Sequence, residues 1–188
     1  LSLHLEGANN SFSVVSSGAN FTEVEFQLED YELIPSRVND INYQRIFHPE
    51  AEPSLEEGLP EIPIFTFSVA VPNKGLISLK SVNIVDSKTV SGIKIFPSQG
   101  PDLTISTERG LAINEQFYKK NTLYPNNVAV MGEPAVMRDY RYITVNVTPF
   151  RYNPSREELD ISSKIRFRLE YDTSKEGVNE LTNPPRKL

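Results

Sequence analysis

The side chains that could act in catalysis are few in this sequence. The only histidines are His4 and His48. His48 stands beside Pro49 and Glu50, so a carboxylate could orient its ring, as a hydrolase triad requires. Such a triad also needs a serine on a tight turn, and no serine motif of that kind is present. We therefore expect His48 to be a surface-loop residue, and we expect the chain to have no catalytic residue.

Cysteine is absent from the 188 residues. This absence excludes a disulfide, a thiolate metal site and a cysteine nucleophile in the chain. Five glutamates crowd one segment and offer oxygen ligands that suit calcium, namely Glu50, Glu52, Glu56, Glu57 and Glu61. The segment lacks the alternating aspartates of a calcium loop and contains prolines, which is typical of a solvated acidic loop. We predict no metal and no cofactor.

Charge and hydropathy exclude two classes of partner. The formal net charge is −6 and there is no dense run of Lys or Arg, which argues against nucleic acid or an anionic membrane surface as a partner. The apolar runs are far shorter than the roughly 18 residues that span a bilayer.

Aromatic residues near the end of the chain either fill a core or form a sugar-stacking platform: Tyr140, Tyr142, Phe150 and Tyr152.

Alternating apolar and polar residues indicate strands that bury one face. Val24, Phe26 and Leu28 alternate with glutamate and glutamine, and Ile165–Tyr171 alternates with Lys, Arg and Glu. Short runs of this kind recur between the 14 prolines. They predict an all-β fold, an antiparallel β-sandwich of jelly-roll type with long loops and at most one short helix. The helix is expected over Asn114–Lys120, with Asn114 as its cap.

The expected organisation has three parts. Residues 1–20 are small and polar and predict an N-terminal extension, residues 21–173 form the sandwich, and residues 174–188 form a linker toward a downstream domain. Within the sandwich, residues 76–96 are expected to form three short strands, Leu76–Val85, Lys88–Val90 and Gly92–Phe96. Three charged residues, Arg138, Asp139 and Arg141, are expected to pair with one another on an edge strand.

Three segments carry a family resemblance. Met137–Pro154 contains Pro149-Phe150-Arg151-Tyr152-Asn153-Pro154, upstream lies Gly58-Leu59-Pro60-Glu61-Ile62-Pro63, and between them lies Pro97-Ser98-Gln99-Gly100. In this order and spacing they resemble the N-terminal prodomain of gingipain-type cysteine peptidases. The resemblance covers roughly residues 20–175, and the Pro-x-x-Tyr-Asn-Pro block is its most specific part.

The resemblance implies a role for the loop that follows Pro97–Gly100. In the family the prodomain packs beside the catalytic domain, assists its folding and places part of this loop in the active-site cleft, where a basic residue occupies the specificity pocket. Counting from Gly100, that position falls near Leu103 or Thr104, after Asp102, and none of these residues is basic. Arg109 is the only cation between Pro101 and Ala112. Three readings stay open: Arg109 fills the pocket, the cognate enzyme prefers another residue, or the loop covers the site sterically.

The resemblance also implies export from a bacterium, so that the protein is secreted or lies at the cell surface. Its partner would be the catalytic domain of the cognate cysteine peptidase. Release would then require proteolysis, and two dibasic pairs are candidate cleavage sites, Lys119-Lys120 and Arg186-Lys187. A carbohydrate-binding or adhesive β-sandwich of a bacterial surface protein is the alternative, and a structural accessory module without inhibitory activity is a third.

Overall fold

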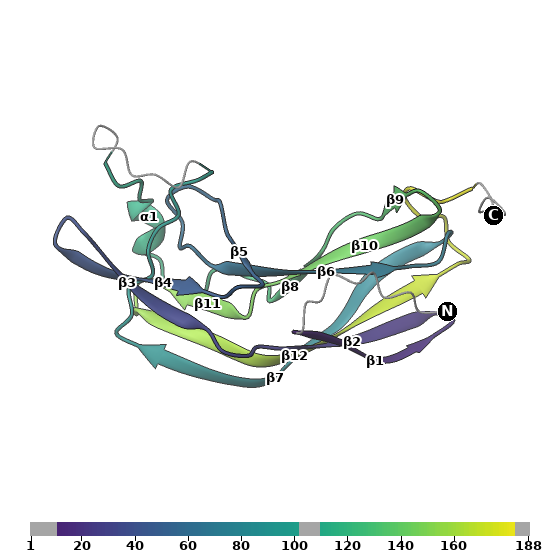
Figure 1. The fold of residues 1–188 in the computed structure, drawn as a ribbon, viewed down its shortest axis with the longest axis horizontal. Helices are drawn as coiled ribbons and strands as arrows, with labels where there is room; N and C mark the ends of the chain where they lie inside the picture. Colours follow the sequence, from purple (N-terminus) through teal and green to yellow (C-terminus); the bar gives the residue numbers. More distant parts are fainter. Residues whose placement is uncertain (1–10, 102–109, 183–188) are drawn as a thin grey trace.

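Two five-stranded antiparallel sheets form the body of the molecule. The computed structural model describes residues 11–101 and 110–182 (Figure 1). The first sheet has the order β1-β2-β12-β11, with β7 on the other side of β12. Its strands are β1 (Phe12–Gly18), β2 (Phe21–Gln27), β7 (Leu76–Ser91), β11 (Phe150–Asn153) and β12 (Glu158–Asp172).

The second sheet has the order β5-β6-β10-β8, and β9 also pairs with β10. Its strands are β5 (Glu52–Pro53), β6 (Pro63–Ala70), β8 (Ala129–Met131), β9 (Ala135–Met137) and β10 (Tyr140–Val147). A separate hairpin is made of β3 (Glu32–Val38) and β4 (Ile41–Phe47). The one helix of the described residues is α1 (Glu115–Tyr118), and no helix among them is long and apolar enough to cross a membrane.

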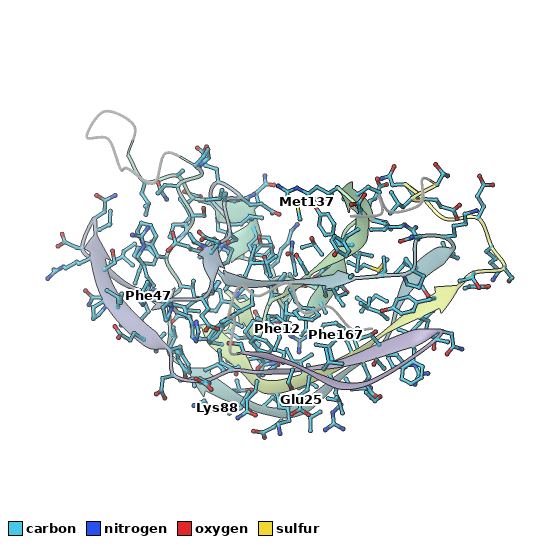
Figure 2. All side chains as sticks on the ribbon, turned by 45° about the vertical axis from the view of Figure 1, so that its right-hand side comes forward. Phe12, Glu25, Phe47, Lys88, Met137 and Phe167 are labelled. Carbon is cyan, nitrogen blue, oxygen red and sulfur yellow. The ribbon has the colours of Figure 1, made fainter. Side chains whose placement is uncertain are left out.

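The core lies between the two sheets. Phe26 of β2 meets Phe65 of β6 edge to face, with ring centroids 4.9 Å apart. Phe12 of β1 stacks on Phe67 of β6 at 5.0 Å. In Figure 2, Phe12 and Phe167 point between the sheets, whereas Glu25 points outward. Because side chains alternate along a strand, the apolar positions of β2 and β12 face inward and their charged positions face solvent. The predicted all-β sandwich is confirmed.

An ion-pair cluster occupies the outer face of the first sheet. The Glu25 carboxylate accepts two hydrogen bonds from Arg166, at 2.6 and 2.9 Å, and Lys164 lies 3.4 Å from its other oxygen. The Arg166 hydrogen bonds, together with the charges of both cations, hold the pKa of Glu25 below its ordinary value. The cluster joins β2 to β12 across their shared ladder.

The prediction of three short strands over residues 76–96 is wrong in its boundaries. The structure has one strand of 16 residues, β7, which pairs with β12 along nearly its whole length. The register shifts between Arg166 and Arg168, opposite which Ser81 adopts a φ of 51°. Such a bulge places an extra residue in one strand without ending the ladder. Asp86 and Ser87, which separate two of the expected strands, therefore lie within one continuous edge strand.

Both ends of the described chain lie against the sandwich. Phe12–Gly18, placed by the sequence analysis in the extension of residues 1–20, form β1 and pair with β2. At the other end, the N–H of Leu181 donates to the carbonyl of Asn73 at 2.9 Å. The Glu180 carboxylate accepts hydrogen bonds from the N–H groups of Gly75 and Gly177, at 2.8 and 3.0 Å. The first residues of the expected linker, 174–182, are thus attached to the turn between β6 and β7.

Arg141 does not form the ion pair expected with Asp139. Its side chain is 1% exposed, and its guanidinium donates to the carbonyls of Pro72, Gly75 and Val178 at 2.9, 3.0 and 2.7 Å. A guanidinium carries five N–H donors in a fixed fork and can therefore join several carbonyls at once. Arg141 holds the C-terminal segment, the β6–β7 turn and β10 together.

Candidate functional site

A side-chain clasp closes the base of the loop that begins at Pro101. The amide group of Gln99 donates to the carbonyl of Ala112 at 3.1 Å, and its oxygen accepts the N–H of Ala112 at 2.9 Å. The same amide nitrogen donates to the carbonyl of Pro97 at 2.7 Å. The two ends of the loop are therefore held together by these hydrogen bonds. The segment before the loop, Pro97–Gly100, is buried at every residue.

Two of the motifs that carried the resemblance lie side by side at this base. The N–H of Gly58 donates to the carbonyl of Ser98, and the N–H of Ser98 donates to the carbonyl of Leu59, both at 2.8 Å. The carbonyl of Gly58 accepts the N–H of Asn114 at 3.0 Å. We call the set Gly58, Leu59, Ser98, Gln99 and Ala112 the loop base.

Gly58 is required by two independent features of its position. Its φ is +78°, in the left-handed region that side chains disfavour. A Cβ added there would lie 2.9 Å from the backbone nitrogen of Asn114. Glycine therefore permits the two segments of the loop base to approach closely.

The helix α1 follows the loop base directly. Asn114 caps it, and the Asn114 side-chain oxygen accepts the N–H of Phe117 at 2.9 Å, so the predicted cap is confirmed. The processing candidates Lys119 and Lys120 end this segment and are both exposed. Lys119 lies 3.8 Å from Glu115, at a distance that leaves its ammonium largely in solvent.

Two tyrosines, the partly buried Tyr118 and the buried Tyr152, interact with the backbone of Ile95, two residues before Pro97. Tyr118 of α1 donates its hydroxyl hydrogen bond to the carbonyl of Ile95 at 3.1 Å, and burial raises its pKa. Burial also raises the pKa of Tyr152, of the Pro-x-x-Tyr-Asn-Pro block, to about 12. These phenols stay neutral at physiological pH, so they serve as packed hydrogen-bonding groups in this position.

Glu61 is not part of a solvated loop as the sequence suggested. Its side chain is buried and accepts a hydrogen bond from Arg45 at 3.0 Å, while the Arg45 guanidinium lies 4.3 Å from the centre of the Phe96 ring. Burial raises the pKa of Glu61, and Arg45 opposes that rise. In the described part of the chain, no three acidic or histidine side chains are arranged to hold a metal ion.

His48 is a core residue, so the expectation of a surface-loop histidine is wrong. It is 6% exposed, its ring packs edge-on against Phe65 at 4.7 Å, and its Nδ1 accepts the N–H of Glu50 at 3.1 Å. The sugar-stacking platform considered above is also not formed, because Phe150 and Tyr152 are buried in the core.

The remaining candidates fall outside what the structure describes. The proposed inhibitory residues Asp102, Leu103, Thr104 and Arg109 belong to residues 102–109, and the processing candidates Arg186 and Lys187 belong to residues 183–188. The structure describes the loop base, which lies on either side of residues 102–109 in the sequence. Gln99, the central residue of the loop base, was not identified from sequence, because only its position in the Pro-Ser-x-Gly motif marks it.

Comparison with known proteins agrees with the geometry. The family model Propeptide_C25 matches residues 5–184, nearly the whole chain. The chain belongs to the Propeptide_C25 family. The resemblance to the propeptide of gingipain-type cysteine peptidases is thereby confirmed.

Curated relatives of this propeptide come from Porphyromonas gingivalis. Gingipain R1 is 26% identical over 169 residues, which cover 88% of this chain and 17% of that protein. Gingipain R2 is 24% identical over 179 residues, which cover 94% of this chain and 24% of that protein. The chain thus spans about a quarter or less of these relatives.

Two solved structures share the fold. One is a complex of the pro- and mature domains of Porphyromonas gingivalis RgpB, with a TM-score of 0.77, 24% identity and coverage of 93% of this chain and 91% of that chain. The other concerns the zymogenic latency of gingipain K from the same organism, with a TM-score of 0.68, 18% identity and coverage of 92% and 98%. The likeness extends over the whole sandwich.

Proposed function

We propose that this propeptide inhibits the cysteine peptidase domain of its own precursor, assists the folding of that domain, and is removed by proteolysis. The observation that supports the proposal is the loop base, in which Gln99 hydrogen-bonds to Ala112 and joins the two ends of the loop beside the buried residues Pro97–Gly100. The solved complex of pro- and mature domains of a similar protein supports the choice of partner. The protein is exported by a bacterium and is secreted or held at the cell surface.

A rigid loop base favours tight inhibition for a thermodynamic reason. A binding loop loses conformational freedom when it enters a cleft, and that loss opposes affinity. The contacts among Gln99, Ala112, Ser98 and Gly58 fix the two ends of the loop before any partner binds. The entropy of closing the loop is therefore already lost in the free propeptide.

Within the loop, we propose that Arg109, its only cation, occupies the specificity pocket of the peptidase domain. A desolvated guanidinium that meets a pocket carboxylate is among the strongest contacts an interface can hold. The competing assignments are Leu103 or Thr104 in the register of the family, next to Asp102, and steric cover by the loop as a whole. The precursor is cleaved after the dibasic pairs, Lys119-Lys120 or Arg186-Lys187.

Inhibition is tested with the 188-residue chain and the catalytic domain of the same precursor. The wild-type chain should inhibit well below about 1 µM, as expected for a specific inhibitor. Arg109→Ala should weaken inhibition at least about tenfold while Thr104→Ala leaves it unchanged, a difference of about 1.4 kcal/mol in binding. Absence of inhibition by the wild-type chain at about 10 µM would overturn the proposal, since propeptides of this role bind far more tightly.

A further inference from the structure

The chain turns back after β12 and is then held against the sandwich a second time. Residues 173–176 form an exposed turn, in which 66% of the Lys175 side chain is accessible to solvent. The next residues, 177–181, run past the start of β9 and lie against the β6–β7 turn (Figure 1). We call residues 177–181 the C-terminal latch.

Hydrogen bonds join the C-terminal latch to three other segments. The Val178 carbonyl accepts from the buried guanidinium of Arg141, in β10, at 2.7 Å. The side-chain amide of Asn179 donates to the carbonyl of Pro134, just before β9, at 2.8 Å. The Glu180 carboxylate accepts from two N–H groups, one of which belongs to the turn between β6 and β7. The latch is therefore a fixed part of the fold, although it lies close to the end of the chain.

The peptide bond after Lys175 is exposed but is held from both sides. The N–H of Ser174 donates to the Asp172 carboxylate at 3.1 Å, and the Lys175 ammonium lies 3.0 Å from the same carboxylate. Only residues 173–176 separate β12 from the latch, and four residues extend over at most about 14 Å. A peptidase cuts a folded segment through its transiently opened form, so the rate follows the population of that form. Opening around Lys175 therefore requires release of the latch.

We propose that the bond between Lys175 and Glu176 is a further proteolytic processing site, and that the C-terminal latch controls its cleavage by a peptidase that cuts after lysine. Water adds across this bond, so Lys175 gains a carboxylate and Glu176 gains an amino group. The inference deepens the proposed function, on which it rests. A cut after Arg186-Lys187 would leave the latch attached to the propeptide, whereas a cut after Lys175 would separate the latch from it.

Loss of the latch removes hydrogen-bond partners from groups that the fold keeps in place. Arg141, which is 1% exposed, would lose the Val178 carbonyl, and the N–H of Gly75 would lose the Glu180 carboxylate. A buried donor without its acceptor destabilises the folded state. The cut propeptide would therefore unfold more often, and proteolysis of the unfolded form is irreversible. The position of the cut would thus decide whether the released propeptide survives as an inhibitor or is degraded.

The test digests the 188-residue chain with a lysine-specific endopeptidase and follows each cut by mass spectrometry. Glu180→Ala removes the acceptor of two N–H groups, so it should accelerate the cut after Lys175 at least about fivefold. Val178→Thr is the matched control, because the Val178 side chain is 49% exposed and its carbonyl remains. It should change the rate by less than about twofold, as surface substitutions do. Equal rates for the two variants would overturn the inference.

Two further measurements keep the test decisive. If Glu180→Ala does not fold, Asn179→Asp releases the latch from the carbonyl of Pro134 instead and should also accelerate the cut. The isolated product of residues 1–175 should melt about 4–8 °C below the uncut chain, since it has lost the latch. An equal melting temperature would overturn the role of the latch in the fold. None of these measurements uses the catalytic domain of the precursor, so failure of the proposed function is recognised separately, by the inhibition assay.

Discussion

Replacement of Gly58 by alanine should weaken the loop base by an amount that the structure allows to be estimated. A left-handed φ costs a residue with a side chain about 1–2 kcal/mol. The new Cβ would also lie 2.9 Å from the nitrogen of Asn114, so this segment must shift and weaken the hydrogen bond between the Asn114 N–H and the Gly58 carbonyl. Such a bond contributes about 1 kcal/mol.

Alanine also restricts the unfolded chain, which offsets about 0.4–1 kcal/mol of these losses. The expected net loss for Gly58→Ala is about 2 kcal/mol in the free energy of unfolding, or about 4–8 °C in the melting temperature of a domain of this size. Gly92→Ala is the matched control, since Gly92 has a φ of +75° and a Cβ added to it would meet nothing within 4 Å. It should lose about 1 kcal/mol or less.

Urea denaturation and calorimetry of the two variants measure this difference directly. The inhibition constant measured in parallel should increase for Gly58→Ala and stay unchanged for Gly92→Ala, because only Gly58 supports the loop base. Equal stability losses in the two variants would refute the reasoning that close approach to Asn114, rather than backbone conformation alone, requires glycine at this position.

Three other substitutions test separate parts of the structure. Gln99→Met leaves both backbone groups of Ala112 without their side-chain partners, so it should lower the free energy of unfolding by about 1–3 kcal/mol in urea titrations and weaken inhibition. Glu25→Gln should cost up to about 1 kcal/mol at pH 7, and the cost should shrink as the pH falls below 4.5. Stabilisation by a carboxylate of lowered pKa is present above its ordinary pKa of 4.5 and is lost as the pH falls through the lowered value. Arg141→Met should cost about 2–4 kcal/mol by thermal melting and expose residues 174–182 to limited proteolysis, whereas exposed Arg138→Met should do neither.

The parts of the fold that follow from local pattern were predictable. Val24, Phe26 and Leu28, like Ile165 and its apolar neighbours in β12, alternate with charged residues, and a period of two fixes which face is buried. The Asn114 cap depends only on residues within one turn. The family could also be recognised from sequence, because the three motifs occur in the family's order along the chain. That comparison needs no knowledge of how the motifs are arranged in space.

The parts that depend on distant segments were not predictable. The Gln99–Ala112 clasp joins residues 13 positions apart across a loop, and no periodic pattern marks it. Arg141 suggested a surface ion pair because arginine is seldom fully buried, but its acceptors are carbonyls from the β6–β7 turn and the C-terminal segment. His48 follows β4 and precedes a proline, as loop residues do, and only the packing of β6 supplies Phe65 as its cover.

The attachment of residues 174–182 has a consequence for how the precursor is switched on. They lie at one end of the long axis, while α1 and the hairpin lie at the other (Figure 1). Under the proposed function, the peptidase domain is linked covalently to the propeptide at the first end and is inhibited by the loop at the second. The covalent link keeps the inhibitory loop at an effective concentration in the millimolar range near the active site. One cut in the link lowers that concentration to the bulk concentration of the propeptide. Cleavage would then turn permanent inhibition into inhibition that dilution reverses, so the zymogen would remain latent where it is concentrated and become active as it disperses.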